Sequence, residues 1–246
     1  MKNETLRKLK EMRLPAFAEQ YEKQIENEIE YQSLSFHERL ALLVESESAS
    51  RHTNNVNRLI HKASFSIPAA YMKNIKYLPD RHLNRDLLES LSDNEYIRQG
   101  LNVILTGATG SGKTYISNAL GVNACQHGYH TKYIRLPAFF SQLEAARVQG
   151  KYAQFMKQYS KYSLLILDEF LLVETVASQR NELLELIEKR SGIVSTIFCS
   201  HYKPAYWHEL LGAGALAESI LDRLTTSAYE MHIEGDISMR QRKKEL

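Results

Sequence analysis

The clearest chemistry in this sequence lies in nine consecutive residues, "GATGSGKTY" (107–115), which follow the apolar run "NVILT". They fit the pattern G-x-x-x-x-G-K-[ST], in which a glycine-rich loop surrounds phosphate groups with backbone N–H donors. The lysine at the end of this pattern can reach the β- and γ-phosphates, and the next hydroxyl is placed to bind Mg²⁺. The sequence therefore predicts a nucleotide-binding loop. Its predicted contact residues are Gly107, Ala108, Thr109, Gly110, Ser111, Gly112, Lys113, Thr114 and Tyr115.

A second candidate site lies in "LLILDEF" (164–170), where four apolar residues precede two acidic ones. Asp168 would emerge at the end of a buried strand, where a carboxylate can hold Mg²⁺ together with Thr114. Glu169 would then polarise a water molecule for attack on the γ-phosphate. Two acids at a strand end can also simply face solvent, but their position downstream of a phosphate loop favours the first interpretation. No arginine-rich lid pattern lies between 115 and 160, so hydrolysis by water is expected rather than transfer to an acceptor.

Further polar residues near the predicted strands could complete such a site. The strand-like run "VSTIFCSHY" places Ser200 or His201 at its carboxyl end, between the two carboxylates and the γ-phosphate. Arg223 lies in a short helix before the last strand, and Arg240 follows that strand. An arginine can stabilise the charge of phosphoryl transfer, from its own subunit or from a neighbour. Each could equally be a surface or ion-paired arginine, and the motif alone leaves this open.

The elements that would position these groups fall into three segments. Residues 1–62 have a helical pattern, with an interruption at Pro15 and a capping box formed by Ser35 and Glu38. We interpret this segment as a small all-helical domain that binds DNA or a partner. The apolar stripe of its second helix is predicted to be Phe36, Leu40, Leu43 and Val44.

Residues 63–100 are interpreted as a basic connector, and residues 101–246 as an α/β domain in which apolar runs alternate with helical segments. The predicted strands are 102–106, 131–136, 163–168, 194–200 and 229–233. The predicted helices lie near 113–127, 138–158, 178–190, 204–211 and 215–225. This alternation predicts a five-stranded parallel sheet covered by helices on both faces.

Composition limits the environment and the partners of the chain. Its 43% hydrophobic and 24% charged residues are ordinary for a globular protein, and no apolar run reaches the ~20 residues of a membrane span. The N-terminus lacks the apolar core of a signal peptide. Cys125 and Cys199 are far apart in sequence and fit no metal-ligand spacing, so buried free thiols in the cytoplasm are expected.

The net charge is only +2, so a nucleic-acid surface would need local clustering of basic residues. Such a cluster occurs across 51–86, where only Asp80 and Asp86 oppose seven basic side chains. A solvated connector would look the same, but phosphate contact without base reading is the functional interpretation. The basic residues are Arg51, Arg58, Lys62, Lys73, Lys76, Arg81 and Arg85, of which the first five are our DNA-binding candidates.

Taken in order, several segments resemble the IstB-type transposition helper ATPases, relatives of the DnaC helicase loaders in the AAA+ superfamily. They include "LSFHERLALLVESE", "NVILTGATGSGKTY", "YSLLILDEFLL", "STIFCSHYKPAYWHEL", "LAESILDRL" and "IEGDISMR". The resemblance implies a helical N-terminal domain and an AAA+ ATPase domain without a C-terminal lid. It also implies that Arg223 is an arginine finger acting on a neighbour's ATP and that Arg240 is a sensor-2 arginine.

The resemblance further implies ATP and Mg²⁺ as cofactors, assembly of many copies on double-stranded DNA, and recruitment of an IstA-type transposase. One departure concerns the sensor-1 position, where the family usually has Asn or Gln and this chain has His201, so the choice between Ser200 and His201 stays open. The alternatives are a replicative helicase loader, whose N-terminal domain would grip a helicase, and a small-molecule kinase, for which acceptor and lid features are missing.

Overall fold

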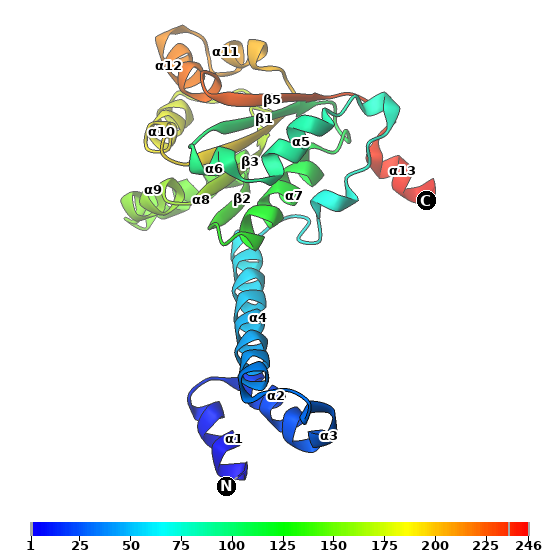
Figure 1. Ribbon diagram of the computed structural model, residues 1–246. Coiled ribbons are helices and arrows are strands. Elements are labelled where there is room, and N and C mark those ends of the chain that lie inside the picture. Colours follow the sequence, from blue (N-terminus) through cyan, green and yellow to red (C-terminus); the bar gives the residue numbers. More distant parts are fainter. Residues whose placement is uncertain (1, 236, 246) are drawn as a thin grey trace. The chain divides into compact units, whose positions relative to one another are not determined.

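The computed structural model describes residues 2–235 and 237–245, and the chain forms two compact units, Met1–Arg58 and Leu59–Leu246 (Figure 1). One long helix, α4 (Phe36–Ala63), contributes residues to both units. The predicted boundary after residue 62 therefore falls inside a helix, because α4 continues without a break through the polar stretch that follows its apolar stripe.

The first unit is helical, as predicted. It contains α1 (Lys2–Glu11), α2 (Pro15–Glu26), α3 (Glu28–Tyr31) and most of α4. The expected capping box is present, because the Ser35 backbone N–H donates to Glu38 Oε2 at 2.7 Å and the Glu38 N–H donates to Ser35 Oγ at 3.3 Å. The buried Glu47 carboxylate of α4 accepts the N–H groups of Ala16 and Phe17, each at 3.1 Å, and so satisfies two free donors at the start of α2.

The predicted apolar stripe of α4 is mostly exposed. Only Leu43 is buried, at 7% exposure, whereas Phe36 is 81% and Val44 is 54% exposed. Helical periodicity identifies the residues that share a face, but it does not determine whether another element covers that face.

The second unit is built on a five-stranded parallel sheet in the order β2-β3-β4-β1-β5. The strands are β1 (Asn102–Gly107), β2 (Thr131–Arg135), β3 (Leu164–Phe170), β4 (Ser195–Ser200) and β5 (Ala228–Ile233). All five predicted strands are confirmed, and so is their parallel pairing. Since the strands run in one direction, the residues that follow their carboxyl ends meet at a single edge.

Helices cover both faces of this sheet (Figure 1). On one face α7 (Lys113–Gln126) packs against strand residues such as Val103 and Leu105, and on the other face Ile104 joins a second core. That second core includes residues of α8 (Leu136–Val148), α9 (Tyr152–Ser160), α10 (Ala177–Glu188), α11 (Trp207–Leu210) and α12 (Gly214–Thr225). The single helix predicted over 138–158 is two helices, α8 and α9, separated by Gly150 at φ 69°.

The segment 63–100 is not a connector in the structure. It carries the short helices η1 (Met72–Asn74), η2 (Pro79–Arg81), α5 (Arg85–Ser92) and α6 (Glu95–Arg98). Its apolar residues belong to the core on the α7 side of the sheet, and those that are buried include Phe65, Ala70, Ile75, Leu88, Leu91, Tyr96 and Ile97. The sequence concealed this role because most of these residues are too irregularly spaced to indicate a regular element.

The two cysteines are free and buried, as expected. Burial raises the pKa of Cys125 to about 11, so its thiol stays protonated and unreactive near neutral pH. Among the residues that the structure describes, no helix is long and apolar enough to cross a membrane.

Gly121 tests the packing of the segment 63–100 against α7. A Cβ atom at this position would lie 2.5 Å from Phe65 Cε1 and 2.8 Å from Ile166 Cδ1. We expect Gly121→Ala to lower the free energy of unfolding by about 1–2 kcal/mol, because overpacking outweighs the helix propensity gained from alanine. Urea unfolding of this variant should show the loss, and the double variant with Phe65→Leu should recover part of it. A Gly121→Ala protein more stable than the parent would contradict this packing.

Candidate nucleotide-binding site

The P loop (residues 107–114) joins β1 to α7 at the carboxyl edge of the sheet. Gly110 (φ 83°) and Gly112 (φ 100°) both occupy conformations that favour glycine. A Cβ atom on Gly110 would lie 2.2 Å from Ser238 Oγ, and one on Gly112 would lie 2.7 Å from Arg81 Nη2. The loop can therefore turn and be closely covered by other segments only because these positions lack side chains.

Lys113 opens α7 and turns its side chain back over the loop. Its ammonium group donates to the carbonyl oxygens of Gly107 at 2.6 Å and Ala108 at 2.8 Å. Burial lowers the pKa of Lys113, and the nearby Arg240 guanidinium adds to this lowering, while Asp168 opposes it. The ammonium group thus lies in the concave part of the loop, where phosphate oxygens can replace the two carbonyl oxygens as its hydrogen-bond acceptors.

The predicted Mg²⁺ ligands meet in the structure. Thr114 Oγ1 donates to Asp168 Oδ2 at 2.8 Å, and the Glu169 backbone N–H donates to Asp168 Oδ1 at 2.9 Å. Within the described part of the chain, no three His, Cys, Asp or Glu side chains gather as a complete metal cage. One hydroxyl and one carboxylate fit Mg²⁺ held jointly with nucleotide phosphates, since Mg²⁺ takes few protein ligands in such sites.

Glu169 is presented by an irregularity in β3. The strand continues through Phe170 rather than ending at Asp168, and its register with β4 shifts between Leu167 and Phe170. Within this bulge Glu169 adopts φ 55°, a left-handed conformation that is costly outside glycine and recurs at functional sites. Its half-exposed carboxylate lies 3.7 Å from Arg135 Nε at the end of β2.

The sequence did not reveal the role of Arg81 in the site. Arg81 is only 4% exposed and donates from Nη2 to the Ser111 carbonyl oxygen at 2.8 Å and from Nη1 to the Lys76 carbonyl oxygen at 2.7 Å. It holds the P loop from the outside, so the placement of Arg81 in a basic surface cluster was wrong. No local pattern distinguishes this arginine from its exposed neighbours, because its partners are backbone atoms and the one in the P loop lies 30 residues away.

The segment after β5 also contacts the P loop. The Met239 backbone N–H donates to the Gly110 carbonyl oxygen at 2.9 Å, at the start of α13 (Met239–Glu245). Arg242 of the same helix forms an ion pair with Asp80, the neighbour of Arg81. Arg240 is exposed and follows Met239 directly in the chain, so the same backbone contact brings Arg240 next to the P loop.

The two sensor-1 candidates differ in their surroundings. Ser200 is fully buried, and its hydroxyl donates to the Phe170 carbonyl oxygen at 2.8 Å while accepting the indole N–H of Trp207 at 3.2 Å. The next residue, His201, is exposed at the end of β4. The hydroxyl of Ser200 is thus used within the protein, and a nucleotide contact by either residue stays a prediction.

Arg223 lies at the opposite edge of the sheet. Its carbonyl oxygen accepts a hydrogen bond of 3.5 Å from Asn102, the first residue of β1, whereas the P loop begins at the last residue of β1. At ~3.3 Å per residue, β1 separates these two edges by about 17 Å. The half-buried guanidinium pairs with Glu188 at 3.1 Å. Arg223 therefore cannot reach the P loop of its own chain without a large rearrangement.

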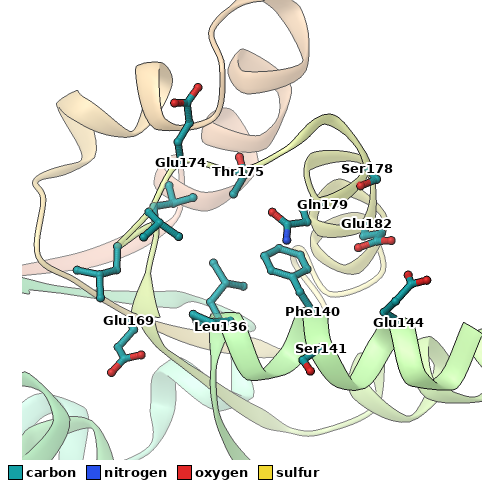
Figure 2. Close-up of a pocket in the computed structure, with 14 residues that line it drawn as sticks. Leu136, Phe140, Ser141, Glu144, Glu169, Glu174, Thr175, Ser178, Gln179 and Glu182 are labelled. Carbon is teal, nitrogen blue, oxygen red and sulfur yellow. The ribbon is translucent and has the colours of Figure 1, made fainter.

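A cavity of about 380 Å³ opens beside Glu169, between α8, α10 and the loop after β3 (Figure 2). In Figure 2 the Phe140 ring and the Gln179 side chain converge on its centre, and Glu144, Glu174 and Glu182 lie around it. No P-loop residue lines this cavity. It adjoins the candidate base but is distinct from the phosphate-binding site.

All five DNA-binding candidates are exposed. Arg51 and Arg58 belong to the first unit, where Arg51 pairs with Glu47 and Arg58 donates to Asn55 Oδ1 at 2.7 Å. Lys62, Lys73 and Lys76 belong to the second unit. Exposure permits phosphate contact at these positions, which stays a prediction.

A phosphate loop, an aspartate near the end of β3 that is bonded to the loop threonine, and a five-stranded parallel sheet define a nucleotide-binding protein with a P-loop fold. Solved structures agree on this fold. The structure of the DnaC helicase loader matches with a TM-score of 0.56 at 18% identity, over 67% of this chain and 97% of that one. AMPPCP-bound DnaA from Aquifex aeolicus matches with a TM-score of 0.59 at 20% identity. This match covers 73% of this chain and 56% of the DnaA chain.

Sequence relatives identify the family. The family described as "IstB-like ATP binding protein" matches residues 7–246, and the chain belongs to it. An insertion sequence ATP-binding protein of Sinorhizobium fredii is 33% identical over 241 residues, covering 98% of this chain and 96% of the relative. The ATP-binding protein of insertion sequence IS1162 from Pseudomonas fluorescens is 36% identical over 200 residues, covering 81% and 86%. The chain is thus an insertion-sequence-associated ATP-binding protein.

Arg81 and Arg85 offer a matched pair for testing whether the hydrogen bond from Arg81 to the Ser111 carbonyl oxygen supports the P loop. Arg81→Met removes two charge-assisted hydrogen bonds to backbone carbonyls, and we expect it to lower the free energy of unfolding by about 2–3 kcal/mol and to weaken ATP binding. Arg85→Met removes an exposed ion pair with Glu89 on α5 and a cation–π contact with the Tyr77 ring, both at the surface, and should change either property much less than Arg81→Met does. Urea unfolding and titration with a fluorescent ATP analogue measure the two effects. Equal behaviour of both variants would show that Arg81 does not support the loop.

Proposed function

We propose that this protein is an ATP-hydrolysing transposition helper that assembles on duplex DNA, recruits a transposase of the IstA type and disassembles when ATP is hydrolysed. The observation that carries this proposal is the contact between Thr114 and Asp168 beneath a P loop, with Glu169 beside it, in an insertion-sequence family. These groups suit hydrolysis of a nucleotide by water and not only its retention.

ATP would bind with its β- and γ-phosphates in the P loop. Lys113 would exchange its bonds to two loop carbonyls for phosphate oxygens, and the N–H groups at the start of α7 would donate to the same phosphates. Ser111 Oγ is buried and has no hydrogen-bond partner among the described residues, which leaves one more donor at the loop for a phosphate oxygen. Thr114 and Asp168 would hold Mg²⁺, which supplies charge neutralisation for the phosphates when bound.

Glu169 would act as the general base that orients and polarises the attacking water. Its carboxylate is half exposed and next to Asp168, so it can reach a water molecule without being fully desolvated. Arg240, which follows the residue that contacts the Gly110 carbonyl oxygen, would add positive charge at the phosphates in the sensor-2 role. Both residues would act at the same edge of the sheet as the P loop.

Arg223 would act on the nucleotide of a neighbouring copy. Its position at the far edge of the sheet supports this, since one copy's Arg223 edge must then face the next copy's P-loop edge. This is a heterologous, head-to-tail contact with bound ATP between the copies. Hydrolysis would remove that link and release the assembly.

DNA binding would use the exposed candidates Arg51, Arg58, Lys62, Lys73 and Lys76 as phosphate contacts. The relatives are named for insertion sequences, which supports a transposase as the partner. The second candidate function is a replicative helicase loader, which the fold similarity to the DnaC loader favours. Pull-down with a replicative helicase and with the transposase of the same insertion sequence would separate these two functions.

Electron microscopy of the protein on duplex DNA tests ATP-dependent assembly. With a non-hydrolysable ATP analogue we expect ordered oligomers on DNA, and without nucleotide we expect only scattered particles. Lys113→Ala should bind no ATP and form no oligomers under either condition, since the loop loses its phosphate-reaching charge. Oligomers that form equally well without nucleotide would contradict the proposed role of ATP.

Mixing two inactive variants tests the shared site. Glu169→Gln should bind ATP but hydrolyse it slowly, and Arg223→Ala should keep an intact pocket but lack the finger for its neighbour. In an equal mixture, about one interface in four joins an intact pocket to an intact finger. Steady-state phosphate release should therefore recover to well above that of either variant alone. If the mixture stays inactive while both variants still bind ATP and assemble, Arg223 does not act in trans.

A further inference from the structure

The Asp168 carboxylate has a hydrogen-bond donor that the P-loop pattern does not include. Tyr133 of β2 donates its phenol O–H to Asp168 Oδ2 at 2.9 Å, and Thr114 Oγ1 donates to the same oxygen at 2.8 Å. The remaining oxygen, Oδ1, accepts the backbone N–H of Glu169. The carboxylate is therefore held by donors from β2, from α7 and from its own strand.

The register of the sheet explains why Tyr133 can reach this position. Tyr133 pairs with Ile166 across the β2–β3 ladder, and Asp168 lies two residues further along β3. Residues that are diagonal neighbours on one face of a sheet are within reach of a long side chain. Tyr133 is itself only 7% exposed, so its ring is fixed by packing and its hydroxyl has little freedom to turn away.

The two side-chain donors to Asp168 Oδ2 differ in what a bound metal ion would require of them. The Thr114 hydroxyl must turn from Asp168 toward a metal ion if it becomes a ligand. Tyr133 would then be the side-chain donor that still orients the carboxylate.

We propose that Tyr133 is a positioning residue of the metal–nucleotide site, whose hydroxyl fixes the orientation in which Asp168 meets Mg²⁺. This inference rests on the proposed ATP-binding function. A group that orients a metal-binding carboxylate affects metal affinity without touching the metal, and its loss typically costs about 10–100-fold in affinity. The alternative is that Tyr133 contributes only a buried hydrogen bond to stability.

Tyr133→Phe removes the hydroxyl and keeps the buried ring, and Tyr159→Phe is the matched control. Tyr159 is a buried tyrosine of the same unit whose hydroxyl donates to Gln142 Oε1 at 3.3 Å, away from the P loop. Each variant would be titrated with a fluorescent ATP analogue in EDTA and at increasing Mg²⁺ concentrations. The thermal unfolding of each variant would be measured as well. We expect Tyr133→Phe to raise the half-saturating Mg²⁺ concentration about 10-fold, while affinity in EDTA changes less than about twofold. Tyr159→Phe should change neither.

A double variant separates orientation of Asp168 from other effects. Asp168→Asn should abolish the Mg²⁺ dependence, and adding Tyr133→Phe should change binding no further, since both substitutions act on one interaction. If Tyr133→Phe lowers the melting temperature but leaves the Mg²⁺ dependence like that of Tyr159→Phe, the positioning role is overturned. If wild-type protein binds the analogue with no Mg²⁺ dependence, the proposed function fails instead, and this inference fails with it.

Discussion

The site depends on one constraint, which is that all five strands of the sheet run in the same direction. Parallel pairing brings the loop after β1 and the end of β3 to one edge, where Thr114 meets Asp168 at 2.8 Å although 53 residues separate them in sequence. Reversing either strand would place these oxygens at opposite edges. The other candidate groups Lys113, Glu169 and Arg240 lie at the same edge, in or beside the P loop and near the end of β3.

The sheet was predictable because each strand is a short apolar run bounded by turns, and helical segments separate the runs. The P loop and Asp168 were predictable for a similar reason, since their chemistry requires particular residue types at fixed local spacing. The bulge at Glu169 was not, because a register shift depends on the neighbouring strand. The strand was expected to end at Asp168, yet it continues to Phe170 and presents two carboxylates in succession.

Long-range contacts account for the remaining differences. Arg81 and Tyr133 look ordinary in sequence, one in a basic segment and one in a strand, and each gains its role from atoms more than 25 residues away. The segment 63–100 was interpreted as a connector, although Phe65 and Leu88 are buried in the core. Apart from the end of α4, its longest helix is α5, so the buried residues of the segment share no single period.

The same parallel sheet that assembles the P-loop edge separates Arg223 from it. An arginine at the amino edge can serve phosphoryl transfer only in another copy, so a single chain would hold an incomplete site. Head-to-tail contacts of this kind repeat, and they give a closed ring or an open helix according to the rotation between copies. In the proposed assembly, duplex DNA and bound ATP would both favour the assembled state. Hydrolysis at each interface would then weaken the contact between copies that brought Arg223 to the neighbour's ATP.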